Sequence, residues 1–221
     1  MTSGIVALTG AEWVGGVMSA TRQGDSDLRV IATLEDDDRR ELLTLARTAI
    51  TTTAVTGQRS LPEVSELPPR LREQGTCFVT LRQGDERLGT TGEVTVEQPL
   101  GVDVAECALN TAFDDPRIPS IDRTQLDALS IEISILGPLV PTGASSYDEL
   151  RQCIDGKHEG LVVEDGERRV TFLPHVWEEV RDTEDFLALL WRKAGLTPGD
   201  WPPNLSTASY RAETISDRPP G

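Results

Sequence analysis

Residues 76–97 read Thr-Cys-Phe-Val-Thr-Leu-Arg-Gln-Gly-Asp-Glu-Arg-Leu-Gly-Thr-Thr-Gly-Glu-Val-Thr-Val-Glu, and this stretch decides the fold. Its first part, Thr76 to Leu81, is β-branched and aromatic enough for a buried strand. The segment from Gln83 to Glu86 contains Gly and Asp and favours a turn. From Thr90 to Glu97 the valines share one face, as in a second strand. The stretch therefore predicts an antiparallel hairpin.

Outward from this hairpin, the spacing of apolar residues predicts helices and strands in two similar halves. Hairpins dominate, and no strand-to-helix turn carries a phosphate-binding glycine loop. We therefore expect an α+β fold with mainly antiparallel pairing rather than a parallel doubly wound sheet. The predicted helices are residues 39–54, 102–113, 146–154 and 182–194, and the further predicted strands are 131–136, 160–164, 169–172 and an edge strand at 208–215.

The chain of 221 residues is expected to hold one folded domain over residues 34–215. Residues 1–33 are rich in Gly, Ser and Thr and show no sustained period, so a flexible extension is predicted there. Residues 216–221 are predicted to form a disordered tail.

The formal net charge of −16 disfavours binding to nucleic acid or to an anionic membrane, which requires clustered basic residues. A nucleic-acid binder would need arginines gathered on one face, for example Arg39, Arg40, Arg168 and Arg169. The sequence contains neither a signal-peptide pattern nor a run of about 20 apolar residues. A cytoplasmic location is therefore expected.

The three cysteines, Cys77, Cys107 and Cys153, form no CxxC pair and leave one thiol over in any disulfide scheme. Buried thiols in a reducing compartment are the expected state. The alternative is a metal site of three thiolates assembled in space. Because no motif spacing supports a metal or a cofactor, neither is expected.

Seven segments, taken together and in order, resemble the AMMECR domain family. The resemblance spans roughly Asp36 to Ala212, so residues 34–215 are expected to be an AMMECR-like domain. The segments are Cys77 to Leu81, Gly89 to Gly92, Asp114 to Arg117, Ile131 to Leu136, Gly156 to Leu161, Thr171 to Val176 and Phe186 to Leu196.

The resemblance implies two related β-α subdomains that share one curved, mainly antiparallel sheet. It also implies a link to the AmmeMemoRadiSam system, in which such proteins are called protein A and occur beside a Memo-like protein and a radical SAM enzyme. It assigns no reaction, and it leaves open whether the chain is an enzyme.

The chain departs from the family at its hallmark motif, Leu-Arg-Gly-Cys-Ile-Gly, which reads Arg-Leu-Gly-Thr-Thr-Gly at residues 87–92. Both glycines remain, so the backbone shape of the motif is expected to survive. Thr90 replaces the cysteine and cannot supply a thiolate. Leu88 replaces the arginine and cannot make a bidentate contact with a carboxylate or phosphate.

The motif and three other side chains form the predicted binding groove. His158 is either a general base or a polar loop residue, and Arg117 either pairs with the acids before it or binds a ligand. Glu132 faces either solvent or the concavity of a curved sheet. The predicted groove residues are Leu88, Gly89, Thr90, Thr91, Gly92, Arg117, Glu132 and His158.

Two functions remain open from the sequence. The first is a non-enzymatic accessory protein that binds a protein partner, a Memo-like or radical SAM protein as the resemblance suggests. The alternative is a small enzyme that acts on a polar substrate through Thr90 and His158, with Glu132 or Arg117 within hydrogen-bond reach of the same site.

Overall fold

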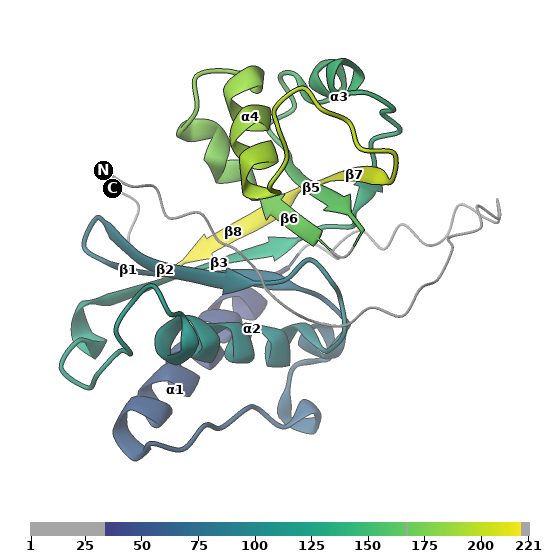
Figure 1. Cartoon of the computed structure of the whole chain (residues 1–221). Helices are drawn as coiled ribbons and strands as arrows, with labels where there is room; N and C mark the ends of the chain where they lie inside the picture. Colours follow the sequence, from purple (N-terminus) through teal and green to yellow (C-terminus); the bar gives the residue numbers. More distant parts are fainter. Residues whose placement is uncertain (1–33, 167, 218–221) are drawn as a thin grey trace. The chain divides into compact units, whose positions relative to one another are not determined.

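The computed structural model describes residues 34–166 and 168–217, which divide into two compact units (Figure 1). Among these residues, unit 1 comprises 34–136 and 213–217, and unit 2 comprises 137–212 without residue 167. The predicted extension at 1–33 and residues 218–221 of the predicted tail lie outside the described residues.

Unit 1 is a four-stranded sheet with two helices on one of its faces (Figure 1). Its helices are α1 (Asp36–Thr56) and α2 (Leu100–Leu109), and its strands are β1 (Cys77–Gln83), β2 (Glu86–Gly92), β3 (Leu129–Leu136) and β8 (Ala212–Ser216). Single helical turns lie at Val64–Glu66, Pro69–Arg72 and Leu126–Ala128, and a π-helical turn at Asn110–Asp114 extends α2. The strand order is β2-β1-β3-β8, and β1 pairs antiparallel with both β2 and β3.

The core of unit 1 follows from the spacing of its apolar residues. Leu42, Ala46 and Ile50 stand four residues apart on α1, so they share one stripe, and each is at most 1% exposed. In the strands alternate residues face the helices, as Val79 and Ile133 do at 0% exposure. The residues between them therefore point to the other face of the sheet.

Unit 2 holds a second four-stranded sheet in the order β4-β7-β5-β6, with antiparallel pairing. Its strands are β4 (Val140–Pro141), β5 (Gly160–Asp165), β6 (Arg168–Phe172) and β7 (Leu205–Tyr210), its helices are α3 (Tyr147–Ile154) and α4 (Thr183–Lys193), and a 3₁₀ segment spans Pro174–Glu178. Phe186 and Trp191 of α4 are 0% exposed and form the centre of its core. Tyr147 meets Trp191 edge-on, with ring centroids 5.0 Å apart.

The predicted α+β class with antiparallel pairing is confirmed. The prediction that both halves share one sheet is wrong in detail, because the described residues form two separate sheets. The predicted edge strand at 208–215 explains the difference, since the chain leaves one sheet and enters the other there. Only Arg211 separates β7 from β8, so one run of residues contributes a strand to each sheet.

The predicted hairpin is present, but its second strand is displaced. It was expected at Thr90 to Glu97, whereas β2 begins at Glu86, directly after the turn, and ends at Gly92. The register pairs Gln83 with Glu86 and shifts once, between Leu81 and Arg82. Such a bulge leaves an extra residue in one strand, which alternation alone does not reveal.

The ordered chain also extends beyond the predicted boundary at residue 215. Strand β8 includes Ser216, and the Asp217 carboxylate accepts a hydrogen bond of 2.8 Å from the Ile131 backbone N–H. An acceptor of this kind fixes the end of the strand to β3.

Candidate functional site

The residues of the divergent motif lie along β2, at the edge of the unit 1 sheet. The register places Thr90 opposite Thr80 of β1, and Thr80 opposite Glu132 of β3. Opposite residues of antiparallel strands point to the same face. Thr90, Thr80 and Glu132 therefore form one polar row across three strands, on the face away from the helices.

The threonine hydroxyls in this row are buried and bonded to each other. Thr80 is 2% exposed and Thr90 is 4% exposed, and their hydroxyl oxygens lie 2.9 Å apart. Glu132 lies at the other end of the row, half-buried, with a carboxylate oxygen 3.8 Å from the Arg82 Nε. The backbones of β2 and β3 are separated by two strand spacings, about 10 Å.

The neighbouring Thr91 points to the opposite, helix-facing side of β2. Its hydroxyl donates to the Cys107 carbonyl oxygen at 3.0 Å and lies 2.5 Å from the Thr111 hydroxyl. Thr111 is the second residue of the π-helical turn that extends α2, and its hydroxyl donates to the same carbonyl at 2.7 Å. Thr91 thus joins β2 to the end of α2.

Gly89 and Gly92, the two glycines of residues 87–92, are sites of close approach. A Cβ atom on Gly92 would lie 2.2 Å from the Cys77 carbonyl oxygen, and one on Gly89 would lie 2.7 Å from an Asp115 carboxylate oxygen. Real Cβ contacts are longer than both distances. A side chain at either position would therefore clash with its surroundings, which explains why both residues are glycine.

Asp115 and Arg117 form a bidentate ion pair beside β2. The Arg117 Nε donates to Asp115 Oδ1 at 2.7 Å, and its Nη2 donates to Oδ2 at 2.5 Å. The same Nη2 donates to the Thr90 carbonyl oxygen at 2.8 Å. The predicted pairing of Arg117 with a preceding acid is therefore present, and Arg117 contacts the motif through the backbone.

The Asp115 carboxylate is held in its ionised form by these contacts. Its side chain is 1% exposed, and burial alone would raise its pKa. Hydrogen bonds from Arg117 and from the Thr90 backbone outweigh burial, so the pKa of Asp115 lies below its ordinary value. Asp114, which precedes it, pairs instead with Arg59.

The remaining predicted groove residues lie elsewhere. Leu88 is half-buried and packs against the core of unit 1. His158 belongs to unit 2, where its exposed backbone adopts a positive φ of 53° and its imidazole stacks on Trp177 at 5.3 Å. The structure thus places Arg117 against the Thr90 backbone, while the Thr90 and Thr91 side chains point to opposite faces of β2. Glu132 lies at the end of the polar row.

The hydroxyl pair yields a double-mutant prediction. Thr90→Val should lower the free energy of unfolding by about 1–2 kcal/mol, because the buried Thr80 hydroxyl loses its partner. Thr80→Val combined with Thr90→Val should recover most of this loss, since neither hydroxyl is then left unpaired. Urea unfolding of the four proteins measures the cycle. Strictly additive losses would show that the two hydroxyls do not depend on each other.

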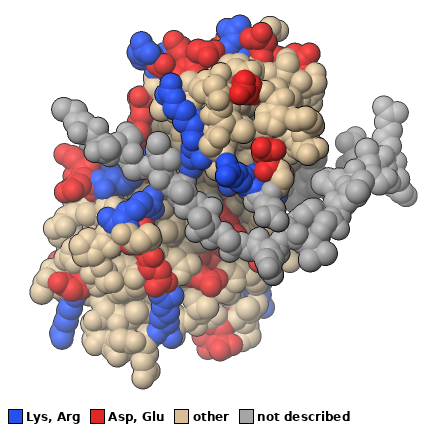
Figure 2. Space-filling model, in the orientation of Figure 1, with Lys and Arg blue, Asp and Glu red and all other residues tan. Residues whose placement is uncertain are grey.

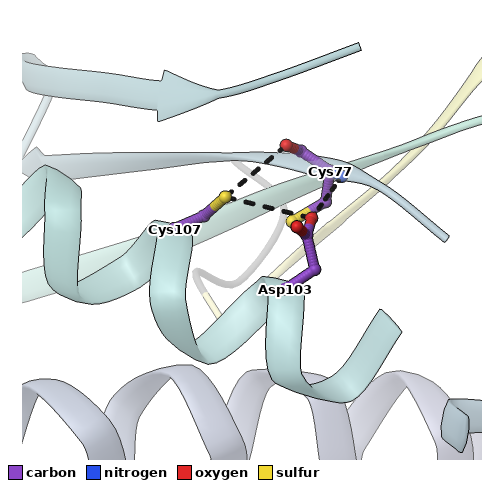
Figure 3. Close-up of side chains that lie close together, drawn as sticks. All are labelled: Cys77, Asp103 and Cys107. Atoms are coloured by element: carbon purple, nitrogen blue, oxygen red, sulfur yellow. Dashed lines mark hydrogen bonds between the residues drawn. The ribbon is translucent and has the colours of Figure 1, made fainter. Parts of the chain in front are cut away.

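A second polar cluster in unit 1 was not predicted from the sequence (Figure 3). Cys77 of β1, Asp103 and Cys107 of α2 offer ligand atoms that all lie within 4.8 Å of one another. The available signal was the spacing of Asp103 and Cys107, four residues apart in a predicted helix. The three-thiolate site considered as an alternative from the sequence also included Cys153, which lies in unit 2.

The charged surface shows acidic and basic side chains interspersed on the face seen in Figure 2. Three of the four arginines that a nucleic-acid site would need are paired with acids: Arg39 with Glu213, Arg40 with Asp37 and Arg169 with Glu164. Across residues 34–166 and 168–217, no helix combines the length and apolar character required to cross a bilayer.

The chain is similar to a group of archaeal proteins. A protein from Methanothermobacter thermautotrophicus is 34% identical over 76% of this chain and 87% of its own length, and protein MK0488 from Methanopyrus kandleri is 32% identical over 81% and 88%. The crystal structure of the uncharacterised protein PH0010 from Pyrococcus horikoshii superposes with a TM-score of 0.75 at 32% identity, covering 83% of this chain and 93% of that chain. The model of the AMMECR1 family matches residues 43–215. The chain therefore belongs to the AMMECR1 family.

Proposed function

We propose that this protein is a non-catalytic accessory protein that binds a protein partner through the surface beside β2. The observation that carries the proposal is the state of Thr90, which occupies the position of the family cysteine. The residue is 4% exposed, and its hydroxyl oxygen lies 2.9 Å from that of Thr80. A hydroxyl that is buried and bonded within the sheet is a poor nucleophile, so the motif serves shape rather than chemistry.

The surface available to a partner combines an aliphatic and a cationic group. Leu88 lies half-buried on β2, and the Arg117 side chain is 34% exposed beside the same strand. Because Asp115 already fixes the guanidinium, little side-chain freedom is lost when Arg117 contacts a partner. Rigid arginines next to apolar side chains are frequent energetic centres of protein interfaces.

The resemblance names the classes of partner: a Memo-like protein or a radical SAM protein. The alternative of a small enzyme acting through Thr90 and His158 stays a prediction. The burial of Thr90 and the two strand spacings between it and Glu132 give that alternative no support.

Binding can be measured between the full chain and purified Memo-like and radical SAM proteins of the same organism. Leu88→Arg should weaken the complex at least about tenfold, because a charged side chain replaces an apolar contact. Val140→Arg is the matched control: Val140 is 50% exposed in unit 2, and its replacement should leave the affinity unchanged.

Two outcomes would overturn the proposal. One is the absence of a complex with both partner classes at micromolar concentrations. The other is purification of a catalyst whose turnover is lost in Thr90→Ala or His158→Ala, which would establish the enzyme alternative instead.

A further inference from the structure

The cluster formed by Cys77, Asp103 and Cys107 lies between the first strand and the second helix of unit 1. Figure 3 shows Cys107 and Asp103 one helical turn apart on α2, both directed at the start of β1, where Cys77 lies. Cys77 is 0% exposed and Cys107 is 7% exposed. Two thiols and a carboxylate thus meet in the interior of the unit, outside the residues proposed for partner binding.

The distances fit a tetrahedral metal ion with little movement. In such a site two ligand atoms at Zn–S and Zn–O bond lengths lie about 3.5–3.8 Å apart. Here the Cys107 Sγ lies 3.9 Å from Asp103 Oδ2, and all three ligand atoms lie within 4.8 Å of one another. Side-chain rotations that move the ligand atoms by up to about 1 Å would bring them to the separations of a tetrahedral site.

The electrostatics around the cluster favour a cation. Asp103 accepts hydrogen bonds from the Cys77 backbone N–H at 3.0 Å and from the Gln98 amide at 3.3 Å. The same Gln98 amide donates to Glu106 at 2.6 Å, which adds a second carboxylate nearby. Among the described residues, no Lys or Arg forms an ion pair with either acid.

Burial makes the ionised forms of these groups costly without a cation. It raises the pKa of the Cys77 thiol well above its ordinary value, with the neighbouring Cys107 adding to the effect. It also raises the pKa of Asp103, and the charge of Glu106 acts in the same direction. A divalent ion would reverse this, because it stabilises thiolates and carboxylates directly.

We propose that Cys77, Asp103 and Cys107 bind one divalent ion of the zinc class, with a fourth position left for water. The two thiols each release a proton to solvent as the metal–sulfur bonds form, and Asp103 binds as a carboxylate. Thiolates select zinc over magnesium or calcium, which prefer oxygen ligands only. The hydrogen bond from Gln98 orients Asp103, in the manner of an outer-shell partner. The bound ion joins β1 to α2.

The test uses the full chain, freed of metal by a chelator under reducing conditions and titrated with Co²⁺ and then Zn²⁺. Co²⁺ should bind with a stoichiometry of one and give a thiolate-to-cobalt charge-transfer band with the visible bands of tetrahedral cobalt. Zn²⁺ should displace it. At Zn²⁺ concentrations about a hundredfold above Kd, the melting temperature should rise by about 5 °C or more.

Variants assign the ligands. Cys107→Ser and Asp103→Asn should each weaken Zn²⁺ binding by about a hundredfold or more. Loss of a group that only orients a ligand already weakens binding by about 10–100-fold, and loss of a ligand should cost at least as much. Cys153→Ser, which removes the third cysteine in unit 2, should bind as the unaltered chain does.

Several results would overturn the proposal. In the unaltered chain these are cobalt spectra without a thiolate band, or equal binding of Mg²⁺ and Zn²⁺ under reducing conditions. Equal weakening by Cys153→Ser would also count against the site. Because the cobalt spectrum of the unaltered chain is decisive, the proposal remains testable even when a variant fails to fold.

Discussion

Asp115→Ala is expected to lower the free energy of unfolding of unit 1 by about 3 kcal/mol. Its carboxylate is 1% exposed and accepts two hydrogen bonds from the Arg117 guanidinium. Of the Arg117 hydrogen bonds described above, only the one to the Thr90 carbonyl oxygen then remains. The value lies at the low end for a broken buried pair, because Arg117 is 34% exposed and can be rehydrated.

Amide hydrogen exchange of β1 and β2 measures this loss in the unit that holds Asp115. Of the four tryptophans, Trp177, Trp191 and Trp201 lie in unit 2, and Trp13 lies outside the described residues. In a Trp13→Phe background the fluorescence therefore reports unit 2 separately. Asp114→Ala is the matched control, since the Asp114 side chain is 53% exposed and its pair with Arg59 is superficial. It should cost less than about 1 kcal/mol. Equal losses in the two variants would contradict the role of the buried pair.

The same ion pair should make unit 1 sensitive to acid. Because the pKa of Asp115 is lowered in the folded chain, its contribution to stability is complete above its unfolded pKa, roughly pH 4. It is lost as the pH falls through the lowered folded value. Asp115→Asn should remove this part of the pH dependence, which urea titrations at several acidic pH values would reveal.

Gly92→Ala is expected to destabilise unit 1 by about 3 kcal/mol, the upper range for overpacking. The new Cβ atom would lie 2.2 Å from the Cys77 carbonyl oxygen and 2.7 Å from the Phe78 Cα. Both are backbone atoms of β1, so the hairpin would have to separate locally. No rotamer change can relieve such a contact.

Gly84→Ala provides the comparison within the same hairpin. Gly84 has a positive φ of 59° and nothing within 4 Å of an added Cβ, so only conformational strain is introduced, about 1 kcal/mol. Hydrogen exchange of β1 and β2 should separate the two variants clearly. Similar losses would mean that the strands adjust to the methyl group more easily than their register implies.

Much of the fold could be predicted because local patterns and tertiary packing agree. The stripe on α1 and the alternation of β3 both match the faces that become buried. The second strand of the hairpin was misplaced because its residues, from Glu86 to Gly92, are largely polar or glycine. Its position depends on pairing with β1, which no local pattern records.

The site was less predictable than the fold. The motif placed most of the predicted groove on one strand, β2, but the Thr80 hydroxyl that bonds to the Thr90 hydroxyl comes from β1. Asp115 was visible only as an acid at the end of a helix. Cys77 and Cys107 stand 30 residues apart, and only the packing of α2 on β1 brings them together. Such contacts between elements can be predicted only when the register of the strands is known, and the alternation of apolar residues along a strand does not give that register.

The position of β8 in the chain has a consequence for how the protein is made. Residues 137–211 are synthesised after β3 and before β8, which at ribosomal speeds takes on the order of ten seconds. During this interval the nascent unit 1 exposes an unpaired edge of β3, rich in isoleucine, to the crowded exit of the ribosome. Nascent-chain aggregation, and the need for a chaperone, should therefore peak before the last strand emerges and cease once it pairs.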